Sequence, residues 1–225
     1  MRPRSACGVL ETMKANASLR RRPSGFSMLE LVIVLAIVLL VAAMAVPMGM
    51  SAVSNAKLRY AALTFTGLIQ DARIEAVKRN SFFKIEPTVL SNGATGYYVD
   101  LSLPPTARPG ALVTTDPIAP MEQAITLYFG QTGPAPNQAA LVAAVNFTPE
   151  PAGSRPAFNA RGLPCLSASA TSPTCPATIN GGINMGYLTF ISRTAFGATN
   201  WKAVAITPSG RVQLWGYNGA TWSQQ

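Results

Sequence analysis

The sequence predicts an α+β protein in which one long N-terminal α-helix packs on an antiparallel β-sandwich-like head. The first observation is a helical pattern that begins in an apolar stretch near residue 26 and ends at Asn80. No second helical period follows it. The second is a series of short runs after Phe82, rich in β-branched and aromatic residues and separated by Pro, Gly and Asn clusters. A chain of 225 residues has room for one such domain beside a membrane segment.

The composition favours a membrane-anchored protein with a turn-rich β domain over a helical cytosolic enzyme. Hydrophobic residues make up 48% of the chain and charged residues only 12%, with 18 Gly and 18 Pro. Six of the 18 basic residues precede Gly25, so a chain without that leader has 12 basic and 8 acidic residues, a net charge of +4. The basic flank therefore indicates a cytoplasmic N-terminus.

The first half of the predicted helix is apolar on all sides. Residues 31–46 are sixteen uncharged apolar residues in a row, and residues 26–49 would form a helix of about 36 Å, enough to cross a hydrocarbon core of about 30 Å. Pro47 predicts a kink, because proline lacks the amide hydrogen and clashes with the preceding turn. Glu30 stands at the front edge, where a charge costs free energy and indicates a function.

Three interpretations of this segment are open. It could be an ordinary secretory signal peptide, cut after Ala45, or a plain membrane anchor. In the third interpretation, cleavage after Gly25 gives Phe26 a free amine and makes Glu30 the fifth residue of the mature chain. The carboxylate of one subunit could then pair with the amine of a neighbour inside a helix bundle. Only the third interpretation gives Glu30 a role.

The residues "GFSMLE" and the apolar run after them resemble the class III leader of type IV prepilins and type II secretion pseudopilins. The resemblance implies that a prepilin peptidase cuts after Gly25 and methylates Phe26, that Glu30 docks subunits, and that Pro47 is the helix-kinking proline. It implies three partners: the peptidase, other pilins or pseudopilins in a hetero-oligomeric helical filament, and an inner-membrane assembly platform. It also implies a single-pass protein of the bacterial inner membrane, with its head in the periplasm.

The second half of the helix, residues 51–80, is amphipathic. Its apolar residues form one stripe that is expected to pack on the head: Leu58, Ala61, Ala62, Phe65, Leu68, Ile69, Ala72 and Ala76. The run "FTGLIQDARIEAVKRNSFFKI" resembles the helix-to-strand segment of the FimT/GspH group of minor pilins and pseudopilins, including its Ala-Arg-x-Glu-Ala pattern. Within that pattern, Arg73 and Glu75 are either structural salt-bridge residues or partner contacts.

The head is predicted to contain about seven strands in two small sheets. The predicted strands are "FFKIE", "GYYVDL", "AITLYF", "ALVAAVNF", "GYLTFISR", "WKAVAIT" and "RVQLWGY". The last two form a hairpin around residues 208–210, and residues 104–120 and 163–182 are expected to be long surface loops. The segments "FNARGLP" and "PSGRVQLW" again resemble FimT/GspH proteins, which implies the pilin fold.

The expected domain plan has four parts. Residues 1–25 are a cleaved prepilin leader, residues 26–50 a transmembrane helix, residues 51–80 the helix half that packs on the head, and residues 81–225 the periplasmic β-rich head. Cys165 and Cys175 lie in the head, and in an exported protein they are candidates for a disulfide that closes a short loop. Two free thiols are the alternative.

No pattern of catalytic residues is present in the sequence. The chain has no histidine, no Gly-x-Ser-x-Gly and no phosphate-binding loop. We therefore expect a protein that is not an enzyme and needs no metal or cofactor.

The C-terminal hairpin also raises the question of DNA binding. Some FimT-like minor pilins bind DNA through a C-terminal Gly-Arg-x-Arg motif, and here Gly210 and Arg211 match it while Gln213 replaces the second arginine. The loss of one cation removes one phosphate contact. The further candidates are Arg193, Lys202 and Arg161 for phosphate contacts, and Trp201 and Trp215 for stacking. In the alternative interpretation, Arg211 only solvates the end of the hairpin.

The sequence as a whole predicts a minor pseudopilin that resembles type II secretion system protein H. The alternatives are a FimT-like minor pilin that acts in pilus assembly or DNA uptake, and a periplasmic binding domain, secreted or anchored, with an ordinary signal peptide.

Overall fold

A computed structural model describes most of the chain after the leader. The described residues are 26–101, 112–130, 133–150, 153–165, 178–179, 183–195 and 197–225. The chain divides into two units, residues 1–46 and residues 47–225. Helix α1, Met28–Lys78, begins in the first unit and ends in the second.

In the second unit, α1 buries the apolar stripe that its sequence predicts. All eight residues of the stripe are at most 3% exposed, and they form one core with side chains of both sheets. The helix ends where Asn80 adopts a left-handed φ of 47° and the Ser81 amide donates to the Ala76 carbonyl oxygen at 3.1 Å. The amphipathic half of the helix is therefore confirmed as the part that packs on the head.

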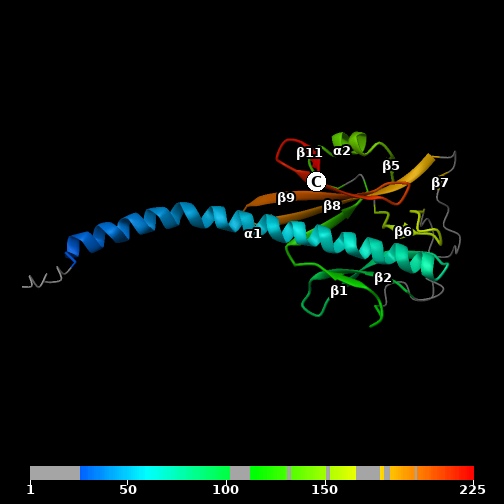
Figure 1. Ribbon diagram of the computed structural model, residues 1–225, viewed down its shortest axis with the longest axis horizontal. Helices are drawn as coiled ribbons and strands as arrows, with labels where there is room; N and C mark the ends of the chain where they lie inside the picture. Colours follow the sequence, from blue (N-terminus) through cyan, green and yellow to red (C-terminus); the bar gives the residue numbers. More distant parts are fainter. Residues whose placement is uncertain are drawn as a thin grey trace, which may run out of the picture. The chain divides into compact units, whose positions relative to one another are not determined.

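Two sheets form most of the rest of the head (Figure 1). The smaller has the strand order β3-β2-β1-β6, and the larger has the order β11-β10-β9-β8-β4, with β5 and β7 also pairing with β8. The strands are β1 (Phe83–Val89), β2 (Thr95–Val99), β3 (Ile118–Pro120), β4 (Ile125–Phe129), β5 (Thr148–Pro149), β6 (Ala157–Phe158), β7 (Thr178–Ile179), β8 (Ile183–Ala195), β9 (Ala198–Ile206), β10 (Val212–Tyr217) and β11 (Trp222–Gln224). Apart from the short parallel pair of β5 and β8, the pairings are antiparallel.

The larger sheet is covered on both faces. Alternate residues of β9 enter two different cores, as the period of two in a strand requires. Val204 and Ile206 pack in the core with α1, whereas Ala203 and Ala205 pack in a second core with helix α2, Gln138–Val145. Figure 1 shows α2 on the side of β8 and β9 opposite to α1. The fold class is confirmed: a long helix and antiparallel sheets, consistent with a pilin fold.

The prediction of a strand in "ALVAAVNF" is wrong, because this run forms most of α2. Its buried residues, Leu141 and Val145, are four apart and share one face of the helix. Alanine has the highest helix propensity, and Asn137 and Asn146 flank the helix in left-handed conformations. A short apolar run of this kind is compatible with a helix and with a buried strand, so the sequence pattern does not distinguish the two.

The other six predicted strands are confirmed with shifted ends. The hairpin also forms: Ile206 pairs with Val212, and the Gly210 amide donates to the Thr207 carbonyl oxygen at 2.7 Å. The first predicted loop ends in a short strand, β3, and the second contains a short strand, β7. Most of the second loop lies outside the described residues.

Candidate assembly site

The first turn of α1 carries the side chain that is expected to dock one subunit on another. The helix begins at Met28, and the Leu31 amide donates to the Ser27 carbonyl oxygen at 3.1 Å. Glu30 lies in this turn with its side chain exposed, and Phe26 is 76% exposed. Among the described residues, Glu30 has no ion-pair partner. The carboxylate is thus available to a cation from another molecule, and the unpaired amides of a helix start favour negative charge there.

The apolar side chains that follow are exposed throughout the described part of the first unit. All of residues 31–46 are exposed, with Leu39 at 68% and Leu40 at 65%. By length and composition, α1 could cross a membrane. Apolar surface left in water costs roughly 25 cal/mol per Å², so this segment requires lipid or neighbouring helices around it.

In the head, Arg73 joins three segments that lie far apart in sequence. Its Nε donates to the Gly162 carbonyl oxygen at 3.0 Å. Gly210 lies beside the same guanidinium, because a Cβ on Gly210 would be 2.8 Å from Nη2 of Arg73 and 3.1 Å from the Gly162 oxygen. Gly210 has a φ of +80°, which glycine adopts without steric cost. The "DARIEA", "FNARGLP" and "PSGRVQLW" segments therefore meet at one junction, which we call the Arg73 junction.

Glu75, the other charged residue of the helix motif, pairs within its own helix. Its carboxylate accepts from Arg79 at 2.8 Å and from Lys78 at 3.3 Å. The Arg79 hydrogen bond is the main reason that the pKa of Glu75 lies below its usual value. Arg73 and Glu75 are both engaged inside the head, although not with each other.

Arg193, a predicted nucleic-acid contact, is buried in the head. The residue is 8% exposed, and its Nη1 donates to Ser54 Oγ at 2.6 Å while its Nη2 lies 3.3 Å from Glu122 Oε1. Arg193 thus connects α1 to strand β8 and to the segment before β4. Its guanidinium is not presented to an external ligand.

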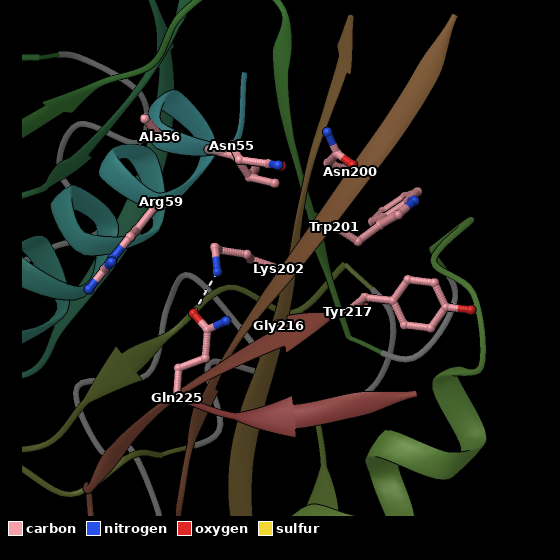
Figure 2. Close-up of a pocket in the computed structure, with 10 residues that line it drawn as sticks. Asn55, Ala56, Arg59, Asn200, Trp201, Lys202, Gly216, Tyr217 and Gln225 are labelled. Carbon is pink, nitrogen blue, oxygen red and sulfur yellow. Dashed lines mark hydrogen bonds between the residues drawn. The ribbon is translucent and has the colours of Figure 1, made fainter. Parts of the chain in front are cut away.

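The other predicted nucleic-acid residues are also dispersed. Lys202 lies on β9, partly buried, and donates to Gln225 Oε1 at 2.5 Å (Figure 2). Arg211 is exposed in the turn after β9. Trp215 is 8% exposed in the core with α2, and Trp201 is half-buried against Tyr128 with ring centroids 5.8 Å apart. The burial of Trp215 leaves no indole face open for base stacking there, and Trp201 already packs against one ring.

Arg161 is the one further candidate that the fold brings close to Arg211. Arg161 precedes Gly162 and Arg211 follows Gly210, and these two glycines adjoin at the Arg73 junction. Both arginine side chains are exposed, and neither has an ion-pair partner among the described residues. The sequence contains both arginines, but the proximity of their turns depends on the tertiary fold.

The cysteine prediction is only partly within the described residues. Cys165 is fully buried and disulfide-bonded, and its backbone oxygen accepts a hydrogen bond from the Tyr187 hydroxyl. Cys175 lies outside the described residues, so the pairing of these two cysteines remains a prediction. The kink at Pro47 also remains a prediction; helix α1 continues through this position.

The family model of the prokaryotic N-terminal methylation motif matches residues 20–46. The matched segment contains Phe26, Glu30 and the exposed apolar run of α1. The chain therefore carries the N-terminal methylation motif of type IV pilin-like proteins. No curated protein and no solved structure matches the chain.

The motif indicates that the pilin-like chain is a structural subunit and not an enzyme. It implies processing by a prepilin peptidase, assembly with other pilins and anchoring in a membrane. Gly25, the expected residue before the cleavage point, lies outside the described residues. The motif is common to pilins and pseudopilins, so it supports both kinds of subunit equally.

Proposed function

We propose that this pilin-like chain is a minor pseudopilin, similar to type II secretion system protein H. In this proposal the prepilin peptidase removes residues 1–25 by cutting after Gly25 and methylates Phe26. Residues 26–50 span the inner membrane once, residues 51–80 attach the helix to the head, and residues 81–225 form a periplasmic head. The observation that supports the proposal is the methylation motif at the start of a helix whose later half is buried by two sheets.

Assembly follows from the chemistry of the new N-terminus. Cleavage creates a cationic amine at Phe26, four residues from the exposed carboxylate of Glu30. When helices of several subunits associate in lipid, an isolated charge is penalised and an opposite charge on a neighbour is strongly attracted. Glu30 of one subunit therefore pairs with the Phe26 amine of the next, which fixes the register between them.

The proposed work of the protein is mechanical. A short filament of such subunits, extended from the inner-membrane platform by a cytoplasmic ATPase, pushes folded substrates towards an outer-membrane pore. Deletion of the gene in the native bacterium tests this role. We expect secreted enzymes to accumulate in the periplasm while surface pili persist; loss of pili with normal secretion would favour a pilus subunit instead.

The processing step has its own test. Mass spectrometry of the mature protein should find an N-terminus at methylated Phe26. A start at Val46 would identify an ordinary signal peptide, and with it a secreted periplasmic binding domain. An intact, unmethylated N-terminus would identify a plain membrane anchor.

A second candidate, a type IV pilus minor pilin that binds DNA, is supported by the adjoining turns that hold Arg161 and Arg211. Two exposed cations on one surface could contact two phosphates, although Gln213 replaces the second arginine of the motif. Binding of duplex DNA to the full chain in detergent should then weaken with salt, and Arg211→Ala and Arg161→Ala should each lower the salt slope by about 1. Lys57→Ala is the control, because Lys57 already pairs with Glu122. Absence of binding at low salt would exclude this candidate.

A further inference from the structure

The head presents a cationic pocket, and none of the described residues that line it has an acidic side chain. The pocket has a volume of about 570 Å³ and lies between the start of the head half of α1 and the ends of strands β9 to β11. Figure 2 shows Asn55 and Arg59 on the helix side and Lys202 and Gln225 on the sheet side. Among the described residues that line it, the charged side chains are those of Arg59 and Lys202.

These two cations are not neutralised within the head. Arg59 has no ion-pair partner among the described residues, and Lys202 donates to the neutral amide oxygen of Gln225 at 2.5 Å. Burial lowers the pKa of Lys202, and the positive charge of Arg59 lowers it further. An anion in the pocket would relieve this repulsion, and in a partly buried site its attraction is screened less than at an open surface.

Gly216 gives the pocket its shape. A Cβ at this position would lie 2.2 Å from Nε2 of Gln225 and 3.5 Å from Nζ of Lys202. The missing side chain therefore leaves room for the Gln225 amide to reach Lys202. A carboxylate could replace this amide as acceptor, because an ionised acceptor binds an ammonium more strongly than a neutral one.

One acidic side chain of the head is exposed and unpaired. The described head contains seven acidic residues, and six of them are either buried or engaged in ion pairs: Glu75, Glu86, Asp100, Asp116, Glu122 and Glu150. The seventh, Asp71, is exposed on α1 and has no ion pair or hydrogen bond among the described residues. Its charge is thus complementary to the pocket and is unused within its own chain.

The positions of Asp71 and Arg59 on α1 suit a contact between copies. The two residues are twelve apart, which corresponds to about 18 Å along the helix and about 120° around it. An exposed apolar face lies between them, formed by Val53 (56% exposed), Tyr60 (70%), Leu63 (50%) and Ile74 (60%). Arg59 and Asp71 thus lie on opposite sides of this face. When two parallel copies pack through it with a shift of about 18 Å, Asp71 of one copy lies opposite Arg59 of the other.

We infer that the pocket of Arg59 and Lys202 receives the Asp71 carboxylate of a second copy of this chain. Because the two halves of the contact are different surfaces, the contact is heterologous and repeats along an open helical filament. The axial offset of twelve residues excludes a closed ring of unshifted copies. The inference rests on the proposed function, in which the chain is a filament subunit, and adds the contact between its heads.

Cysteine cross-linking between two differently tagged full-length copies in membranes tests the inference. One copy carries Asn55→Cys, one turn before Arg59, and the other carries Gly67→Cys, one turn before Asp71. The two cysteines are therefore also twelve residues apart, and the charges of the proposed contact are unchanged. Gly67 has open space around its Cβ position. Val89→Cys, at a strand residue that is 79% exposed, replaces Gly67→Cys in the control.

We expect a dimer that joins the two tags with Gly67→Cys and not with Val89→Cys. Asp71→Lys should lower its yield about tenfold, and Arg59→Glu with Lys202→Glu in the other copy should restore it. A yield that is insensitive to Asp71→Lys, or a cross-link to a different protein, would overturn the inference. If the tagged copies co-purify through Glu30 without this cross-link, or do not co-purify at all, the inference fails. The proposed function is decided separately, by the N-terminus of the mature protein and by the secretion phenotype of the deletion.

Discussion

The Nε of Arg73 on α1 donates a hydrogen bond of 3.0 Å to the carbonyl oxygen of Gly162, 89 residues further along the chain. The bond fixes the end of the helix to the turn after β6. Gly210, in the hairpin turn between β9 and β10, lies against the same guanidinium. One side chain thus connects the helix with two turns of the β structure.

Removal of this side chain should destabilise the head. Arg73→Ala leaves the Gly162 oxygen without its charged donor, and we expect a loss of about 1.5–3 kcal/mol in the free energy of unfolding. Urea titration of the full chain in detergent measures it. Arg59→Ala is the matched control, since Arg59 is an exposed arginine of the same helix, and it should change the stability by less than about 0.5 kcal/mol. Equal losses in the two variants would show that Arg73 is not a special contact.

Gly210→Ala should cost more stability than Gly219→Ala. Both glycines have positive φ, +80° and +97°, so both substitutions introduce backbone strain of about 1 kcal/mol. Only the Cβ at Gly210 meets a neighbour, at 2.8 Å from Arg73, whereas nothing lies within 4 Å of the Cβ position at Gly219. The same unfolding titration compares the two variants. Arg73→Ala combined with Gly210→Ala should be less destabilising than the sum of the single changes, and strict additivity would argue against the contact.

Glu150, at the end of β5, should make the stability of the head depend on pH. The residue is 0% exposed, and burial raises the pKa of Glu150 to about 7, with Ser154 lowering it to a smaller extent. The folded head therefore binds this proton more tightly than the unfolded chain. The resulting stability is present below about pH 4.5 and is lost as the pH rises through about 7.

Glu150→Gln should remove this loss, which is about 3 kcal/mol, when unfolding is measured from pH 4 to pH 8. Glu122→Gln is the control, because the contribution of Glu122 to stability changes with pH in the opposite direction. Hydrogen bonds from Lys57 and Arg193 lower the pKa of Glu122, so its contribution is present above about pH 4.5 and is lost at more acidic pH. An unchanged slope between pH 5 and pH 7 in Glu150→Gln would contradict the assignment.

Glu30→Gln should block assembly while leaving processing and folding intact. The change removes the charge and keeps the shape, so the Phe26 amine of a neighbour loses its partner. Co-purification of two tagged copies from membranes should fall at least tenfold, with leader cleavage and the unfolding transition of the head unchanged. Ser27→Ala in the same turn controls for general disturbance of the segment. Normal assembly of Glu30→Gln would refute the pairing.

The elements with a strong period were predictable from the sequence. The eight apolar residues from Leu58 to Ala76 recur at helical spacing, and all are buried. Alternation placed β9 and β10 correctly because each has one face towards α1 and one towards α2. Helix α2 was not predicted, since its eight residues are too few to distinguish a helical period from a buried strand.

The contacts between distant segments could not be predicted in the same way. Arg73, Gly162 and Gly210 each belong to a recognisable pattern, but a sequence without its fold does not show that the three patterns meet. Arg193 illustrates the reverse error. The sequence shows a cation on a strand, whereas its burial beside Ser54 and Glu122 depends on how α1 crosses the sheet.

The hydrogen bonds that two arginines make between α1 and the rest of the head have a mechanical consequence. Apolar contacts resist separation of the helix from the head but oppose sliding only weakly, because the hydrophobic effect has no direction. Hydrogen bonds are directional and fail when their atoms shift by about 1 Å. Ser54 with Arg193 and Arg73 with Gly162 hold the helix at two points about 28 Å apart. A pull along the helix axis is therefore resisted by these two hydrogen bonds and by the more exposed ion pair of Lys57 with Glu122. The head should slip along its helix when all three contacts are removed.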